Sequence, residues 1–130
     1  MSSPITAIVA YPTKHPETGE SIKFDLNYYT NTHMPLIEKH WAPHGMTSYS
    51  IHEFPNPSPL TGQPQPYHLQ AIVKFKSLEG FKNALEKEGP VTKPDVEKFS
   101  NIFPHVWVAD PVPGGEKTVA GLESDGTAQA

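Results

Sequence analysis

The segment from Tyr67 to Phe75, YHLQAIVKF, constrains the fold more than any other part of the chain. Its residues alternate between two faces, which is the periodicity of a β-strand. One face carries Tyr67, Leu69, Ala71, Val73 and Phe75, and the other carries His68, Gln70, Ile72 and Lys74. Because apolar residues occur on both faces, we expect this strand to lie in a sheet that is covered on both sides.

Three other segments have the composition and alternation of strands. They are residues 5–11, which stop at Pro12, residues 46–54, and residues 102–109, which stop before Asp110. Two further segments have the three- and four-residue apolar spacing of helices.

The first helix is predicted to begin after Asp25, a good N-cap, and to run through DLNYYTNTHMPLIEKHW. Pro35 lies inside it and removes a backbone donor, so we expect a kink there. The second helix, LEGFKNALEKE, begins after Ser77 and is expected to end at Gly89 and Pro90.

The resulting order is β-α-β-β-α-β, which predicts an α+β, ferredoxin-like fold with a four-stranded antiparallel sheet and both helices on one face. The alternation places Phe103, Trp107, Ile72 and His68 on the other face, which is too apolar to remain in water. We therefore expect a second copy to pack sheet to sheet and form a dimeric α+β barrel.

The predicted domain covers residues 1–111. Within it, residues 55–66 contain five prolines and predict a stiff projecting loop. Residues 112–130 are poor in large apolar side chains, which predicts a flexible C-terminal tail.

Charge and composition exclude several classes of protein. Ten basic residues against fourteen acidic ones give a net charge of −4, and the lysines are scattered, so nucleic-acid binding is not expected. The chain has no cysteine for a disulfide, a thiolate zinc site or a thiol nucleophile. Because we find no secretion signal and no apolar run of roughly 20 residues, we expect a cytoplasmic protein without a membrane partner.

Chemistry is concentrated on the first helix. Helical spacing places His33, His40 and Leu36 on one stripe with Tyr29, although the kink at Pro35 makes the pairing of His33 with Tyr29 the safer one. Histidine exchanges protons near neutral pH, and a tyrosine hydroxyl can polarise a carbonyl group. The alternative is that His33 is a buried core residue, which is the more frequent role for one histidine on an apolar helix face.

A metal site is a competing interpretation. It would use His33, His40, His44 and His52, with Glu38 or Asp25 completing the ligand set. His33 and His40 are separated by about 10 Å of helix rise, too far for one ion to bridge. We therefore predict no metal.

The segment FDLNYYTNTHMPL resembles the signature of EthD-like proteins, in which Phe-Asp, Tyr-Tyr and His-x-Pro-Leu open the first helix. The second half is similar as well, from Ala71 through Phe81 to Asp95, Phe99 and Asn101. The resemblance covers about residues 4–111 and implies the dimeric α+β barrel superfamily. Relatives there include fungal decarboxylases and dehydratases of aromatic polyketides, cyclases, isomerases and oxygenases. By this resemblance, His33 corresponds to the family histidine, and Tyr28 and Tyr29 to its tyrosine pair.

These observations lead to a functional hypothesis: an enzyme without cofactor that acts on a small aromatic or polyketide-like carbonyl compound. His33 would be the general acid/base of a lyase, cyclisation or isomerisation step, and Tyr29 would orient the carbonyl. The expected pocket walls are Tyr28, Leu36, His40, Trp41, His52, His68 and Trp107. The alternative hypotheses are a non-catalytic small-molecule carrier or accessory protein of an oxygenase, and a purely structural dimer.

Overall fold

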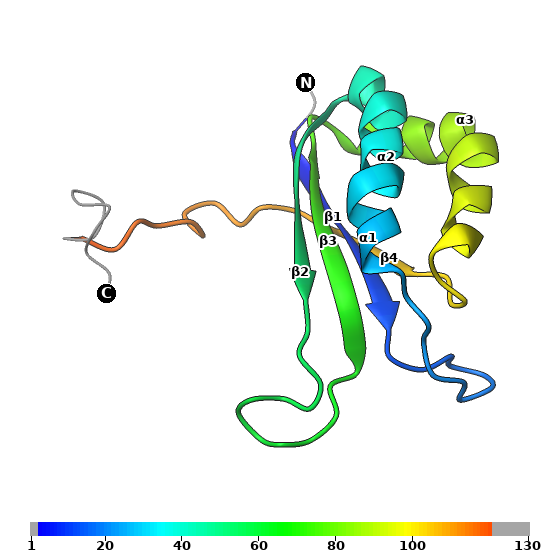
Figure 1. Ribbon diagram of the computed structural model, residues 1–130. Coiled ribbons are helices and arrows are strands. Elements are labelled where there is room, and N and C mark those ends of the chain that lie inside the picture. Colours follow the sequence, from blue (N-terminus) through cyan, green and yellow to red (C-terminus); the bar gives the residue numbers. More distant parts are fainter. Residues whose placement is uncertain (1–2, 121–130) are drawn as a thin grey trace.

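The sheet of the molecule contains four antiparallel strands in the order β2-β3-β1-β4 (Figure 1). The computed structural model describes residues 3–120. Its strands are β1 (Ile5–Pro12), β2 (Met46–Glu53), β3 (Tyr67–Phe75) and β4 (His105–Ala109). The α+β, ferredoxin-like arrangement predicted from the sequence is confirmed, and the first three strands match their expected bounds to within one residue.

The start of the last strand was predicted wrongly. β4 begins at His105 rather than at residue 102. Ile102 is instead buried in the core, while Phe103 and Pro104 lie beside the helices. A proline immediately before the strand explains the delay, because Pro104 has no N–H to donate to a sheet ladder.

Two helical segments pack on one face of the sheet (Figure 1). The first contains α1 (Leu26–Tyr28), a π-helical turn (Tyr29–His33) and α2 (Met34–Trp41), and the second is α3 (Leu78–Asp95). Both expected N-caps are present. The Asp25 side chain accepts from the N–H of Tyr28, and that of Ser77 accepts from the N–H of Gly80.

The prediction that the second helix ends at Gly89 and Pro90 was wrong, because α3 continues through both residues to Asp95. A proline usually disfavours helical geometry in the residue before it by contact with that residue's Cβ, and Gly89 has none. The added turn carries buried Thr92 and Asp95, and contacts of Asp95 described below offset the backbone hydrogen bond that Pro90 lacks.

The disturbance expected at Pro35 takes the form of the π-helical turn before it. There the N–H of Met34 bonds to the carbonyl of Tyr29, five residues earlier. This wider turn shifts the register, so that buried positions recur every four residues at Tyr29, His33, Ile37 and Trp41. Leu36 is only half-buried.

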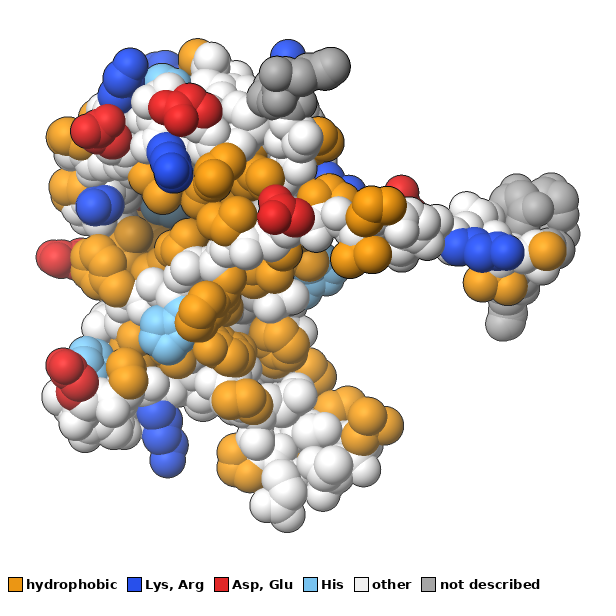
Figure 2. Space-filling model, turned by 180° about the vertical axis from the view of Figure 1, so that it is seen from behind, with side chains coloured by type: hydrophobic (Ala, Val, Ile, Leu, Met, Phe, Trp, Pro, Cys, Tyr) orange, Lys and Arg blue, Asp and Glu red, His pale blue; other side chains and the backbone are white. Residues whose placement is uncertain are grey.

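The sheet face opposite the helices is uncovered in a single chain. Ile8 pairs with Ile72 on β3 and with Trp107 on β4, so these side chains share that face. Figure 2, seen from behind, shows hydrophobic side chains gathered across the middle of the molecule and along the start of the C-terminal segment. Among the exposed large apolar residues, Trp107 lies on this face, whereas Phe103, which was expected here, lies on the helix side together with Val106.

Two segments extend from the domain (Figure 1). The loop over residues 55–66 projects beyond one end of the sheet, as predicted. Residues 110–120 run away from the sheet on the side opposite the helices, without helix or strand. The expected tail also includes residues 121–130, which lie outside the described residues.

Candidate active site

A cavity of about 320 Å³ lies between the sheet and the helices. Its walls come from β1 (Val9, Tyr11), α2 (Ile37, Trp41), α3 (Leu85, Thr92, Lys93), Val96 and the approach to β4 (Phe103, Pro104, Val106), together with His33. This is the size of a small-molecule pocket. Most of the wall is apolar, so His33 is the principal group in it that can exchange a proton near neutral pH.

His33 ends the π-helical turn and is 4 % exposed. Its ring stacks on that of Tyr29, with centroids 5.5 Å apart, and lies 4.5 Å from the centroid of Phe99. The pairing of His33 with Tyr29 on one helix face is therefore confirmed, and both rings are held by aromatic packing.

The polar partner of His33 is Asp95, at the end of α3. Nδ1 of His33 lies 2.8 Å from Oδ2 of Asp95. The other carboxylate oxygen accepts a hydrogen bond of 2.8 Å from the hydroxyl of Tyr28, and Nζ of Lys98 lies 3.6 Å from it. Asp95, itself 6 % exposed, thus links both helical segments.

The protonation states follow from these contacts. Burial would raise the pKa of Asp95, but hydrogen bonds from His33 and Tyr28 outweigh it and hold that pKa below its ordinary value. Burial lowers the pKa of His33, and Asp95 opposes part of this shift. Because an ionised carboxylate only accepts, Nδ1 of neutral His33 must carry the proton, which leaves Nε2 as a proton acceptor.

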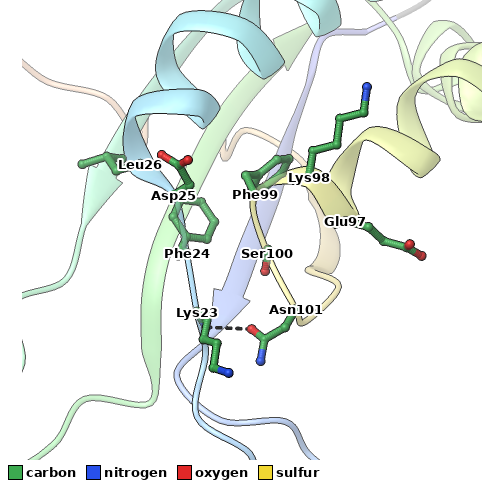
Figure 3. Close-up of a pocket in the computed structure, with 9 residues that line it drawn as sticks. All are labelled: Lys23, Phe24, Asp25, Leu26, Glu97, Lys98, Phe99, Ser100 and Asn101. Carbon is green, nitrogen blue, oxygen red and sulfur yellow. Dashed lines mark hydrogen bonds between the residues drawn. The ribbon is translucent and has the colours of Figure 1, made fainter.

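Phe99 is held in place by a short antiparallel contact between residues 23–25 and 99–101 (Figure 3). The N–H of Lys23 donates to Oδ1 of Asn101 at 2.7 Å, and the N–H of Asp25 donates to the carbonyl of Phe99 at 2.8 Å. The open groove along this contact carries charges of both signs, from Lys23, Asp25, Glu97 and Lys98. We therefore read it as support for Phe99 and not as a second binding site.

Family membership is shown by the sequence itself. The model of the EthD domain family matches residues 17–102. The chain belongs to the EthD domain family. The match includes the His33 segment, α3 and Asp95, whereas the extended residues 110–120 lie outside it.

Solved structures agree with an EthD fold. An EthD-like protein from Ralstonia eutropha JMP134 is 22 % identical, with a TM-score of 0.71 over 85 % of this chain and 93 % of its own. An ethyl tert-butyl ether D (EthD) family protein from Bacillus halodurans C-125 is 21 % identical, with a TM-score of 0.59 over 84 % of this chain and 99 % of its own. A protein described as a candidate monooxygenase from Shewanella loihica PV-4 is 17 % identical, with a TM-score of 0.51 over 86 % and 97 %. A search of curated proteins found no similar sequence.

The other residues expected in the site are dispersed in this EthD chain. Trp41 lines the cavity, whereas Tyr28 does not line it and is linked to His33 through Asp95. Leu36 and His40 lie outside the cavity wall, because the π-helical turn shifts the inward positions to Ile37 and Trp41. Nδ1 of His40 instead lies 2.7 Å from Oε1 of Glu88.

The sheet separates two of the remaining expected residues, His52 and Trp107, from His33. His52 and Trp107 share the face opposite the helices, where Nε2 of His52 lies 2.9 Å from the hydroxyl of Ser50. His68 was expected on that face too, and this was wrong. A register shift next to Tyr67 turns it, and its ring packs on Phe24 at a centroid distance of 5.3 Å.

The histidines considered for a metal are paired separately. His33 bonds to Asp95, whereas Nε2 of His44 lies 2.9 Å from Oε2 of Glu88, the carboxylate that also contacts His40. Within residues 3–120, no group of three or more histidine, cysteine or acidic side chains is arranged to hold a metal ion. In the same range, no helix has the length and apolar character needed to cross a membrane.

The role of Asp95 was not predicted from residue spacing, because the helix that carries it was expected to end six residues earlier. A signal for Asp95 was nevertheless present, since it belongs to the EthD-like residues of the second half. Thr92 and Val96 were also missed as cavity residues, because they lie beyond the expected end of that helix. Leu85 lies within the expected helix and was predicted only as part of its apolar stripe.

Proposed function

We propose that this EthD-family chain is an enzyme without cofactor that acts on a small aromatic or polyketide-like carbonyl compound by acid/base chemistry. The observation that carries the proposal is that His33 lies in the wall of a largely apolar cavity of about 320 Å³ and is paired there with the buried carboxylate of Asp95. The substrate ring would occupy the cavity, with an acidic C–H or O–H bond near Nε2 of His33.

The proposed step is one proton transfer followed by its return. Nε2 of His33 takes a proton from the substrate, and the electron pair of the broken bond moves onto the carbonyl, giving an enolate. The imidazolium so formed is stabilised by Asp95 through Nδ1–H. His33 then returns the proton to carbon or to a leaving group, which completes an isomerisation, a cyclisation or a lyase reaction and regenerates the neutral ring.

A homodimer is part of the same proposal. The uncovered face with Ile8, Ile72 and Trp107 would pack against its copy in a second chain, forming the closed barrel that the family resemblance implies. In this arrangement His33 remains on the helix side of its own sheet, so each chain would hold a separate site.

Proton exchange in D₂O tests the acid/base role without knowledge of the natural substrate. Purified protein is incubated with a panel of enolisable aromatic ketones, and loss of the α-proton signal is followed by NMR. We expect exchange of at least one compound to be accelerated, and His33→Gln to lower that rate about 10²–10⁴-fold. His40→Gln, outside the cavity, is the matched control, and an equal rate in wild type and His33→Gln refutes the proposal.

The second candidate is a non-catalytic carrier or accessory protein of an oxygenase. It is favoured by the mainly apolar cavity wall, which would hold a hydrophobic compound without any reaction. Native mass spectrometry separates the two candidates: a co-purified aromatic compound that remains unchanged and shows no proton exchange supports carriage.

A further inference from the structure

A small inner cavity of about 30 Å³ continues from the main cavity towards the sheet. The two cavities share wall residues on both sides, among them Tyr11, His33 and Trp41. Beyond them the inner cavity is bounded by Tyr29, which does not line the main cavity. We call this space the inner recess. Its volume suits a single water-sized group, such as one oxygen atom of a ligand.

The walls of the inner recess contain polar groups that have no partner. Nε1 of Trp41 is buried and forms no hydrogen bond. In the part of the chain that the structure describes, the tyrosine hydroxyls with a hydrogen-bond partner are those of Tyr28 and Tyr67. Tyr11 and Tyr29, each 1 % exposed, line the same recess, and within residues 3–120 their hydroxyls form no hydrogen bond to another side chain or the backbone. Buried polar groups normally have partners, so the unpaired N–H of Trp41 requires an explanation.

All three groups can donate a hydrogen bond at neutral pH. The indole N–H of Trp41 is a donor only. Burial raises the pKa of Tyr11 and that of Tyr29, so both hydroxyls keep their protons. An environment of donors in a site of low polarity favours an oxygen that carries negative charge.

We propose that the inner recess binds an oxygen atom of an aromatic ligand, one that is a phenolate or becomes an enolate. The ring would lie in the main cavity, and Tyr11, Tyr29 and Trp41 would donate to the oxygen beside Nε2 of His33. This inference rests on the proposed function in that the same cavity holds the ligand. It assigns Tyr11 and Trp41 as two further positioning residues and specifies the substrate class as aromatic compounds with a phenolic hydroxyl or an enolisable carbonyl.

The test uses 4-nitrophenol, whose phenolate absorbs in the visible range, and nitrobenzene, which lacks the hydroxyl. Binding of each to the full-length protein is measured by titration, and the pKa of bound 4-nitrophenol is read from its absorbance as a function of pH. We expect the pKa of the bound probe to fall below that of the free probe. Tyr11→Phe and Trp41→Phe should each weaken 4-nitrophenol binding about tenfold and reduce the pKa shift, while nitrobenzene binding changes less than about twofold.

Tyr67→Phe is the matched control, because it removes a tyrosine hydroxyl that bonds to His105 away from the recess. Tyr11→Phe deletes one oxygen atom, and circular dichroism verifies that each variant is folded. The pKa shift of 4-nitrophenol bound to the wild-type protein tests the proposal without any variant. An unshifted pKa, equal losses for both probes, or no binding of either probe would overturn the proposal.

These readouts are independent of catalysis. If 4-nitrophenol binds with the expected shift but His33→Gln leaves proton exchange unchanged, the recess holds an oxygen and the proposed enzyme function fails. If proton exchange depends on His33 while 4-nitrophenol behaves like nitrobenzene, the function stands and the recess proposal fails.

Discussion

Nδ1 of His33 lies 2.8 Å from Oδ2 of Asp95, although 62 residues separate them in the chain. The contact joins the π-helical turn to the end of α3, and the hydroxyl of Tyr28 bonds to the same carboxylate. One buried acid therefore fixes the orientation of the histidine, its tautomer and the spacing of the two helical segments.

Replacement of this acid by its amide should disable the histidine without removing it. Asp95→Asn loses the negative charge that raises the pKa of His33 against the effect of burial, so the pKa of His33 should fall further. The amide NH₂ can also donate to Nδ1, which would place the ring proton on Nε2. We expect α-proton exchange to fall at least about 10²-fold.

The measurement for Asp95→Asn is an NMR titration of His33 together with the exchange rate. Glu88→Gln is a matched control, because it makes the same change on α3 next to His40 and His44, outside the cavity. A His33 pKa that stays the same or rises in Asp95→Asn would contradict the assigned pairing.

The pH dependence of stability should contain a contribution from His33. Its pKa in the folded protein is lowered by burial, so the unfolded chain binds a proton first as the pH falls below about 6.5. As the pH falls from about 6.5 to the pKa of His33 in the folded protein, the free energy of unfolding should therefore decrease. Below that pKa the contribution of His33 should no longer change with pH. Urea unfolding at a series of pH values measures this dependence. The free energy of unfolding of His33→Gln should change less steeply with pH in this window. Equal slopes for wild type and His33→Gln would refute the buried neutral state of His33.

Most of the fold could be predicted because its signals are local. Alternation identified β1, β2 and β3, and side-chain capping identified Asp25 and Ser77 as helix starts. The errors occurred where tertiary contacts outweigh local preference. α3 passes Gly89 and Pro90 because its last turn buries Asp95 against His33, which no pattern within the helix reveals.

The site was predicted in part for the same reason. His33 and Tyr29 are four residues apart, and their pairing holds in an α-helix as well as in a π-helical turn. Across that turn the inward-facing positions shift by one residue, so Ile37 and Trp41 line the cavity in place of the expected Leu36 and His40. Spacing rules assume a regular helix, so they could not identify the cavity wall beyond Pro35.

Close packing of the two helical segments predicts a glycine requirement at the start of α3. A Cβ atom on Gly80 would overlap the backbone carbonyl oxygen of His44, and a backbone group cannot move aside as a flexible side chain can. Gly80→Ala should lower the free energy of unfolding by about 1–3 kcal/mol, even though alanine is the better helix former.

Chemical unfolding of Gly80→Ala measures this cost. Lys82→Ala, an exposed change in the same turn, should alter the stability by less than about 0.5 kcal/mol. A Gly80→Ala protein as stable as wild type would show that α3 and the turn at His44 are not in close contact.

The uncovered sheet face gives the last prediction. Trp107 is 56 % exposed and shares its face with Ile8 and Ile72, an arrangement that leaves apolar surface in water unless another chain covers it. We expect the wild-type protein to be a dimer at micromolar concentration by light scattering. Trp107→Glu would bury an unpaired charge between the sheets and should shift the protein to monomers that remain folded. Leu60→Glu, at a more exposed apolar residue on the projecting loop, should remain dimeric. A wild-type monomer at this concentration would rule out sheet-to-sheet pairing, whereas the His33 site, on the opposite side of the sheet, would still be complete within one chain.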